Sequence, residues 1–378
     1  MASKHPIYLD NNASTRLDDR VLEEMIPYFT EYYANSGSTH LAGLAVKEAV
    51  EKAAWQTANL IGAAEDQIIF TSGATESINL AIKGFSNEDK KHIITIASEH
   101  KAVLDTCQYM ETIGFEVTYL PVETDGLLDL KLLNDTITDK TLVFIGMLSN
   151  NETGVMQNIK QISSILKAKN VLFLCDATQA VGKIMIDVNE MGIDMLPFSA
   201  HKFHGPKGIG GLYFSAKAKS KLTPQLHGGG QQSKLRSGTL NTTGIIGLGK
   251  AAAIAFDEME SHTKRITELQ DYLEKGLLQF EGSFVNGNIQ NRIYNTSNIC
   301  FPGVNSETLI LALQNISVSN GSSCSAVTSE PSHVLKAMGL SHADALSSIR
   351  FSLSKYTTLE EIEETIDTVL ALAEKFKI

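Results

Sequence analysis

The sequence predicts an α/β protein with a large domain, in which a mostly parallel central sheet lies between helices, and a smaller α+β domain. From about residue 45 to 215, short β-type runs alternate with helical patterns, which is typical of a parallel sheet covered by helices on both faces. A long helical stretch then leads into a second unit that mixes strands with helices. We therefore expect a large domain over residues 16–255 and a small domain formed by residues 1–15 and 256–378.

Each element of the large domain is predicted from its own run of residues. Short apolar runs predict strands at 67–70, 92–97, 116–120, 142–148, 171–175, 195–199 and 210–215. Helical patterns lie between most of these strands, in ESINLAIKGF, KAVLDTCQYMETIG and IKQISSILKAKN. The stretch over 243–280 has no proline or strong breaker after Gly249, so we expect one long helix there that bridges to the second unit.

The smaller unit carries strand and helix patterns of its own. NTSNICF and SSIRFSLS predict strands, and SETLILALQ and PSHVLKAMG predict helices. A final helix is expected to begin at TTLEEIEETI, where Thr358 and Glu361 have the spacing of a capping box.

Composition and charge exclude several classes of protein. The chain has 378 residues, 43% hydrophobic and 20% charged, which is typical of a globular protein with a large core. Its net charge is −11 and it has no basic run, so we expect neither a nucleic acid nor a membrane surface as a partner. The amino terminus lacks an apolar export segment, and no run of 18 apolar residues follows. We therefore expect a cytoplasmic protein.

The four cysteines form no C-x-x-C pair, so a disulfide framework or a zinc site is not expected, and a reducing compartment fits. Cys107, Cys175 and Cys300 have apolar neighbours and are predicted to lie in the core. Cys324 lies instead among small and polar residues, in VSNGSSCSAVTSEPSH, where no periodicity is present. The stretch predicts an accessible loop, and from these residues alone its thiol could be incidental or functional.

Polar residues follow five of the predicted strands. In an open α/β sheet, ligands bind beyond the carboxyl ends of the strands, so these residues are candidates for one site. A single such turn could be only a helix cap, whereas five of them with complementary chemistry indicate a ligand. The candidates are Thr75 in TSGATES, His100, Asn151, Asp176 with Gln179, and Ser199 with His201 and Lys202.

These side chains together suit pyridoxal 5'-phosphate, a phosphorylated pyridine aldehyde. That cofactor needs a lysine for its aldehyde, a carboxylate opposite its ring nitrogen and an anion site for its phosphate. The TSGATES turn opens a helix and can bind phosphate through free backbone N–H groups. Lys202 directly follows a strand and is the preferred lysine, with Lys207 in GPKGIG as the alternative.

The remaining roles follow from the chemistry of the ring. Asp176 would keep the pyridine nitrogen protonated, which makes the ring an electron sink. Gln179 or Asn151 would hydrogen-bond the phenolic oxygen. His100 would stack on the ring and move protons.

With these residues in this order, the chain resembles the class V aminotransferase family of fold-type I pyridoxal-phosphate enzymes. More narrowly, it resembles the cysteine desulfurases of nitrogenase maturation and iron–sulfur cluster assembly. The similarity runs from YLDNNAST to SSIRFSLSKYTTLEEI. The motifs that carry it are TSGATES, SEHKAV, NNETG, DATQAVG, SAHKFHGPKGIGGLY, GGGQQSKLRSGTLN and GSSCSAVTSEPSHVL. The resemblance implies the pyridoxal-phosphate transferase fold of type I.

The resemblance also implies roles for single residues. Lys202 would carry the cofactor, and its phosphate would be bound by Thr75, Ser199, His201 and the backbone of Ala74. A further phosphate contact would come from Thr239 of the partner subunit, which implies a homodimer.

The substrate residues are implied in the same way. Arg350 would bind the substrate α-carboxylate, a task that suits a bidentate guanidinium, with Asn35 assisting. The chain departs from the family near Asn35, where it reads YANSGSTH in place of the common Asn-Pro. It also reads GGGQQ in place of a more usual acidic ending, and TLN in place of TLP at Thr239.

The implied reaction removes sulfur from L-cysteine, giving L-alanine and a persulfide on Cys324. A thiolate is the nucleophile in such a step, and His100 or Lys202 could help to form it. The persulfide would pass to an iron–sulfur scaffold protein or a sulfur-carrier protein. The protein itself would need no metal, although Cys324 could transiently ligate a cluster on a scaffold.

The same scaffold is compatible with other functions. A class V aminotransferase has no use for a loop thiol, so Cys324 argues against it. A selenocysteine lyase shares the chemistry and stays open as an alternative. A non-catalytic relative is a different class, and the intact set of Lys202, Asp176, His100 and Cys324 argues against it.

Overall fold

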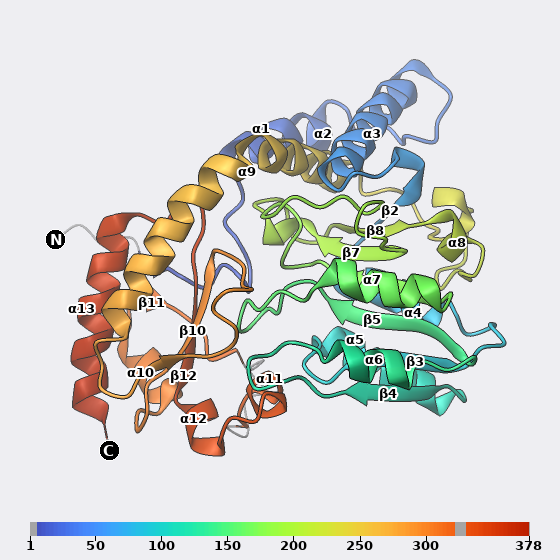
Figure 1. The fold of residues 1–378 in the computed structure, drawn as a ribbon. Coiled ribbons are helices and arrows are strands. Elements are labelled where there is room, and N and C mark those ends of the chain that lie inside the picture. The colour runs from blue at the N-terminus through green and yellow to red at the C-terminus, as the bar shows by residue number, and fades with distance from the viewer. Residues whose placement is uncertain (1–5, 322–329, 378) are drawn as a thin grey trace.

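The computed structural model describes residues 6–321 and 330–377, and its larger sheet has seven strands (Figure 1). Their spatial order is β2-β8-β7-β6-β5-β3-β4. β8 runs antiparallel to both of its neighbours, and every other pair is parallel. The strands are β2 (Ile68–Thr71), β3 (His92–Ile96), β4 (Glu116–Leu120), β5 (Thr141–Met147), β6 (Leu172–Asp176), β7 (Met195–Ser199) and β8 (Gly210–Phe214). The mostly parallel central sheet is therefore confirmed, and each predicted strand overlaps one of these.

Helices cover both faces of this sheet because its strands are apolar on both sides. Leu172 and Leu174 of β6 pack into one core, and Phe173 and Cys175 pack into the core on the opposite face. The helices over the first core are α4 (Ala74–Lys83) and α5 (Lys101–Thr112). Those over the second are α1 (Asp19–Met25), α3 (Leu41–Leu60), α6 (Leu130–Thr136), α7 (Ile159–Ala168) and the first part of α9 (Thr242–Leu277).

The smaller unit surrounds a core of its own. Its three-stranded antiparallel sheet has the order β12 (Ser348–Ser352), β10 (Thr296–Cys300), β9 (Phe284–Val285). β1 (Ile7–Tyr8) pairs in parallel with β11 (Ile316–Ser317), so the start of the chain lies in this unit. Its helices are α10 (Ser306–Ala312), α11 (His333–Ala337), α12 (His342–Leu346) and α13 (Leu359–Phe376).

The 36-residue helix α9 connects the two units and contributes to both cores (Figure 1). Ile245 and Leu248 near its start pack against the large sheet, whereas Leu269 and Leu273 near its end pack in the small core. The boundary expected at residue 255 falls inside this helix and stays a prediction.

Two local expectations are confirmed. Thr358 Oγ1 accepts a hydrogen bond from the Glu361 N–H at 3.3 Å, and the Thr358 N–H donates to Glu361 Oε2 at 3.0 Å, so α13 begins with a capping box. Cys107, Cys175 and Cys300 are fully buried.

In the described part of the chain, no helix combines the length and the apolar character that crossing a bilayer requires.

Candidate active site

A cavity of about 730 Å³ lies where the parallel strands of the large sheet end. Most of the predicted site residues line it: Ala74, Thr75, His100, Asn151, Asp176, Gln179, Ser199, His201, Lys202 and Arg350. Thr239 and Asn35 do not line it, and both are exposed in this single chain. Cys324 lies outside the described residues. The cavity thus collects side chains that are spread over most of the sequence.

Lys202 ends a short 3-10 turn directly after β7, which brings its side chain to the edge of the sheet. Its Nζ donates to the carbonyl oxygens of Asn12 at 2.5 Å and Ala13 at 3.0 Å. Burial and the positive charge of Arg350 lower the pKa of Lys202 to about 8, although Asp176 opposes the shift. A lowered pKa leaves more of the amine unprotonated near neutral pH, which favours attack on an aldehyde.

The alternative lysine, Lys207, also lines the cavity but belongs to the exposed turn before β8. The buried environment that lowers the pKa surrounds Lys202, so the geometry favours the residue that the sequence preferred.

A candidate anion site, called the anion cradle below, lies at the amino terminus of α4. The Ala74 N–H donates to Ser199 Oγ at 3.0 Å, and Thr75 lines the cavity beside it. Gly73 precedes the helix with φ +153°, and a Cβ atom there would lie 3.0 Å from Ser199 Oγ, so glycine permits this close approach. The first N–H groups of a ten-residue helix and its dipole favour a bound anion.

His201 lies next to this cradle without adding positive charge. Its Nδ1 is 3.3 Å from Ser14 Oγ. Burial, followed by the charges of Lys202 and Lys207, lowers the pKa of His201 to about 4. At neutral pH an anion in the cradle would therefore be held by hydroxyls and amides, with a neutral imidazole beside them.

His100 caps α5 and is held in one tautomer. Its Nδ1 accepts a hydrogen bond from the Ala102 N–H at 3.0 Å, so the neutral ring carries its proton on Nε2. The ring keeps contact with solvent in the cavity, but desolvation still lowers the pKa of His100, with Asp176 opposing the shift and Lys202 adding to it. His100 is therefore a neutral N–H donor at the cavity wall.

Asp176 is the last residue of β6 and is almost completely buried. Its Oδ1 accepts hydrogen bonds from the Thr178 N–H at 2.9 Å and the Thr178 hydroxyl at 2.6 Å. These bonds fix the carboxylate at the strand end. Asp176 can therefore stabilise a protonated ring nitrogen in the cavity.

Arg350, on β12, brings the small unit to the cavity. Its guanidinium donates to Asp10 Oδ1 at 2.5 Å and to the Asn151 carbonyl oxygen at 2.9 Å. Within the described residues, Arg350 Nε and Asn151 Oδ1 are buried without a hydrogen-bond partner. Unpaired buried polar atoms are rare in native proteins, and two of them beside one polar cavity indicate that the cavity is built for a polar ligand.

The residues just before the segment 322–329, which contains Cys324, line this cavity, and a residue after it contacts the neighbour of His100. Before it, Gly321 lines the cavity and the Ser319 carbonyl accepts a hydrogen bond from the Arg350 N–H at 2.6 Å. After it, His333 Nε2 is 2.9 Å from the carbonyl oxygen of Glu99, the neighbour of His100.

Three contributors were missed at the level of sequence. Asp10 pairs with Arg350, the Asn12 carbonyl accepts from Lys202, and the buried Lys183 donates to Gln179. The polar run DNNAST directly after an apolar pair was a signal for the first two. Among residues 6–321 and 330–377, no three His, Cys, Asp or Glu side chains gather in a way that could hold a metal ion.

Comparisons with known proteins show which proteins the chain is similar to. The chain is 46% identical over 371 residues to a protein of Methylobacillus flagellatus named cysteine desulfurase IscS, an overlap that covers 97% of this chain and 92% of the relative. A solved structure named NifS-like protein is 38% identical, with a TM-score of 0.92 and coverage of 98% of this chain and all of the other.

A second solved structure, described as SspA in complex with cysteine, is 37% identical. Its TM-score is 0.82, and the overlap covers 93% of this chain and all of the other. These likenesses confirm the fold that the resemblance implied. The profile of the family described as aminotransferase class-V matches residues 7–365, so the chain belongs to the class V aminotransferase family.

Proposed function

We propose that this protein is a cysteine desulfurase that uses pyridoxal 5'-phosphate to convert L-cysteine to L-alanine and a persulfide on Cys324. The observation that carries the proposal is the cavity in which Lys202, with its lowered pKa, shares walls with an anion cradle, Asp176 and Arg350. The names of the similar proteins support the same reaction. One of the similar structures was solved with cysteine, which supports the substrate.

The residues of the cavity fit the cofactor. Lys202 Nζ would bond its aldehyde carbon, Asp176 would hold a proton on its ring nitrogen, and its phosphate would lie in the cradle of Ala74, Thr75 and Ser199. His201 would add a neutral contact to the phosphate. When bound, pyridoxal phosphate supplies an electron sink for the carbon atoms of an amino acid.

The substrate would be oriented from the small unit. Arg350 is held by Asp10 and the Asn151 carbonyl, so its guanidinium is already ordered before a carboxylate arrives. A planar guanidinium with several donors suits the α-carboxylate of an amino acid. Asn35 would assist it only if the exposed loop that carries Asn35 reaches the site, and that role stays a prediction.

The sulfur transfer balances with the Cys324 thiolate as nucleophile. The thiolate forms a new S–S bond to the substrate sulfur while the substrate Cβ–S bond breaks, which leaves a persulfide on the protein. The former Cβ must then gain a proton to become the methyl group of alanine. His100 Nε2–H and the Lys202 ammonium are the proton donors at the cavity, because each carries an N–H there.

The active unit would be a homodimer. Thr239 is exposed and away from the cavity of its own chain, which is expected if it contacts the phosphate in the partner's site. Large apolar side chains on or near the N-terminal helices are also exposed, with Tyr33 at 77%, Leu41 at 86% and Trp55 at 59%. Large exposed apolar side chains are expected where a second protein surface packs.

The persulfide would be passed to an iron–sulfur scaffold protein or a sulfur-carrier protein in the cytoplasm. Delivery requires that Cys324 reach both the cavity and the protein surface. The first of these requirements is supported by Gly321, which lines the cavity, and by the contact of His333 with the carbonyl oxygen of Glu99.

The test is a turnover assay with L-cysteine and a thiol reductant, in which alanine and sulfide are measured together. Wild-type protein should release both in equal amounts. Cys324→Ser should bind the cofactor normally but lose alanine production by orders of magnitude, because a hydroxyl is a poor nucleophile toward sulfur.

Ser325→Ala, which alters the same segment but keeps the thiol, is the matched control and should turn over like wild type. Mass spectrometry after one turnover should place the added sulfur on the peptide that contains Cys324. Sulfur on another cysteine, or wild-type alanine release by Cys324→Ser, would contradict the proposal.

A further inference from the structure

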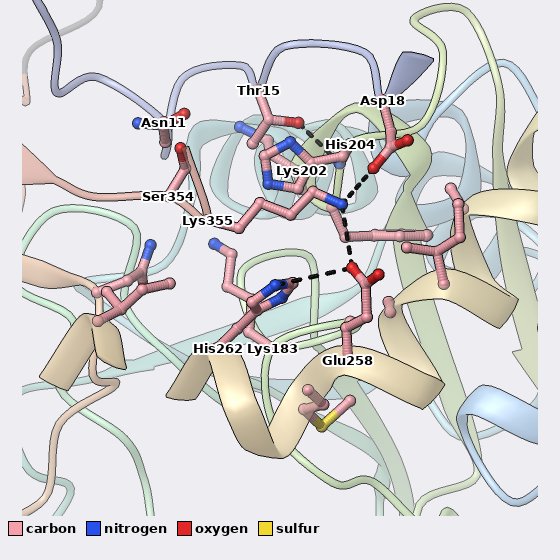
Figure 2. A pocket seen from close by; sticks show the side chains of 18 of the residues that line it. Asn11, Thr15, Asp18, Lys183, Lys202, His204, Glu258, His262, Ser354 and Lys355 are labelled. Carbon is pink, nitrogen blue, oxygen red and sulfur yellow. Dashed lines mark hydrogen bonds and ion pairs between the residues drawn. The ribbon is translucent and has the colours of Figure 1, made fainter. Parts of the chain in front are cut away.

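Lys183 is a buried lysine that none of the roles above uses. Only 7% of its surface is exposed. It lines a second, smaller cavity, which Figure 2 shows. Lys202 lines both this cavity and the cavity of about 730 Å³, which is called the cofactor cavity below. A buried amine is costly unless it is hydrogen-bonded, so its partner is informative.

That partner is the side chain of Gln179. Lys183 Nζ donates to Gln179 Oε1 at 3.0 Å, one helical turn away in the segment DATQAVGK. On the other side of the same amide, Gln179 Nε2 donates to the Asn12 carbonyl oxygen at 2.9 Å. That carbonyl also accepts from Lys202 Nζ. A continuous set of hydrogen bonds therefore runs from Lys183 through Gln179 to the backbone that holds Lys202.

These two contacts allow only one orientation of the Gln179 amide. Lys183 has donors and no acceptor in its charged form, and a backbone carbonyl has acceptors and no donor. A flipped amide would place its NH₂ group against the lysine amine and its oxygen against the Asn12 oxygen. Both contacts would then be lost while Lys183 is protonated, and the Asn12 carbonyl requires the amide nitrogen on its side in either protonation state of the lysine.

Other charged groups near Lys183 are paired elsewhere. Figure 2 shows Lys355 bridging Asp18 and Glu258, with His262 also on Glu258. Within the described residues, the hydrogen bond to Gln179 is the one that the structure gives for Lys183. Burial, and then the charges of Lys202 and Arg350, lower the pKa of Lys183 to about 7.

We propose that Lys183 is a positioning residue that fixes the Gln179 amide so that its nitrogen donates to the phenolic oxygen of bound pyridoxal phosphate. The inference rests on the proposed function for the identity of the cofactor. Gln179 Nε2 has two protons, of which Asn12 takes one. The second is available to the cofactor cavity, which Gln179 lines. Without the Lys183 donor, the amide loses one of the two contacts that orient it.

The test measures cofactor affinity in the absence of substrate. Cofactor-free protein is titrated with pyridoxal phosphate, and binding is followed by the visible absorbance band. Lys183→Met, which keeps the length and removes the donor, should weaken binding about threefold to tenfold, as expected for one neutral hydrogen bond. Lys183→Arg keeps a donor, has the neighbouring cavity to extend into, and should stay within about twofold of wild type.

A double-mutant cycle separates positioning from general destabilisation. In a Gln179→Ala background, Lys183→Met should change the affinity by less than about 1.5-fold, because the group it orients is gone. The pH titration of the visible band should shift in Lys183→Met and in Gln179→Ala alike. Lys217→Met, at a lysine outside both cavities, is the control and should change neither measurement.

An equal loss of affinity in both backgrounds, or no loss in either, would overturn the role of Lys183. If Lys183→Met does not fold, the same cycle with Lys183→Gln decides the matter, because that side chain is polar but one bond too short. A wild-type protein that binds no pyridoxal phosphate would instead refute the proposed function.

Discussion

Lowering the pH below 8 should slow the loading of pyridoxal phosphate onto cofactor-free protein. The reaction requires an unprotonated amine on Lys202, and burial together with the charge of Arg350 lowers the pKa of that amine to about 8. The folded protein thus holds the lysine largely protonated below pH 8 and largely neutral above it. The loading rate should follow the neutral fraction.

The size of the effect follows from the same value. At pH 7 about a tenth of the Lys202 side chains would be neutral, and at pH 6 about a hundredth. A lysine with the ordinary value of 10.5 would be neutral in only about three molecules in ten thousand at pH 7. The rate should therefore fall about tenfold per pH unit below pH 8 and become level above it.

The assay is stopped-flow absorbance after mixing cofactor-free protein with excess pyridoxal phosphate across this pH range. Borohydride reduction followed by peptide mass spectrometry then identifies the lysine that carries the cofactor. Lys207→Ala is the matched control and should keep the wild-type profile, whereas Lys202→Ala should lose the chromophore. A rate that still rises steeply at about pH 10 would show that the lysine pKa is not lowered. A chromophore that survives in Lys202→Ala but disappears in Lys207→Ala would refute the assignment.

Three further changes test other parts of the structure. Asp176→Ala should still bind some cofactor but lose most turnover of L-cysteine, since the ring nitrogen would no longer be held protonated; normal turnover would show that Asp176 only fixes the turn through Thr178. Arg350→Lys should raise the KM for L-cysteine at least about tenfold and leave cofactor affinity within about twofold, because an ammonium cannot bind a carboxylate in a bidentate way. An unchanged KM would exclude Arg350 as the carboxylate ligand. Thr358→Ala should lower the free energy of unfolding by about 1 kcal/mol in urea without affecting turnover, because it removes the cap of α13. An unchanged unfolding midpoint would mean that the cap contributes nothing.

Much of the site could be predicted because of one property of parallel sheets. The carboxyl ends of neighbouring parallel strands lie at the same edge, so residues that directly follow β3, β5, β6 and β7 must meet there. His100, Asn151 and Lys202 follow those strands, Asp176 ends one of them, and all four line one cavity. The strand positions alone are enough to predict that these residues meet, and apolar runs indicate strand positions well.

Contacts made by irregular segments could not be predicted in this way. Asp10 reaches Arg350 and Asn12 reaches Lys202 only because the N-terminal segment folds back across the sheet edge, hundreds of residues away in the sequence. Nothing in the periodicity specifies that path. Lys183 could not be predicted for a different reason, since a lysine in a turn is usually solvated, and residues of α9, distant in the sequence, line the same cavity as Lys183.

The shared helix α9 has a consequence for substrate selection. A rotation of the small unit that moved Arg350 relative to Lys202 would have to bend α9 between the two cores that it joins. No proline interrupts the helix, and sharp bends in helices usually need one or a comparable local defect. The proposed carboxylate ligand, Arg350, and the proposed cofactor lysine, Lys202, therefore belong to two units that one stiff helix joins. A constant separation between Arg350 and Lys202 would select amino acids of one length, while the sulfur would still have to leave the site.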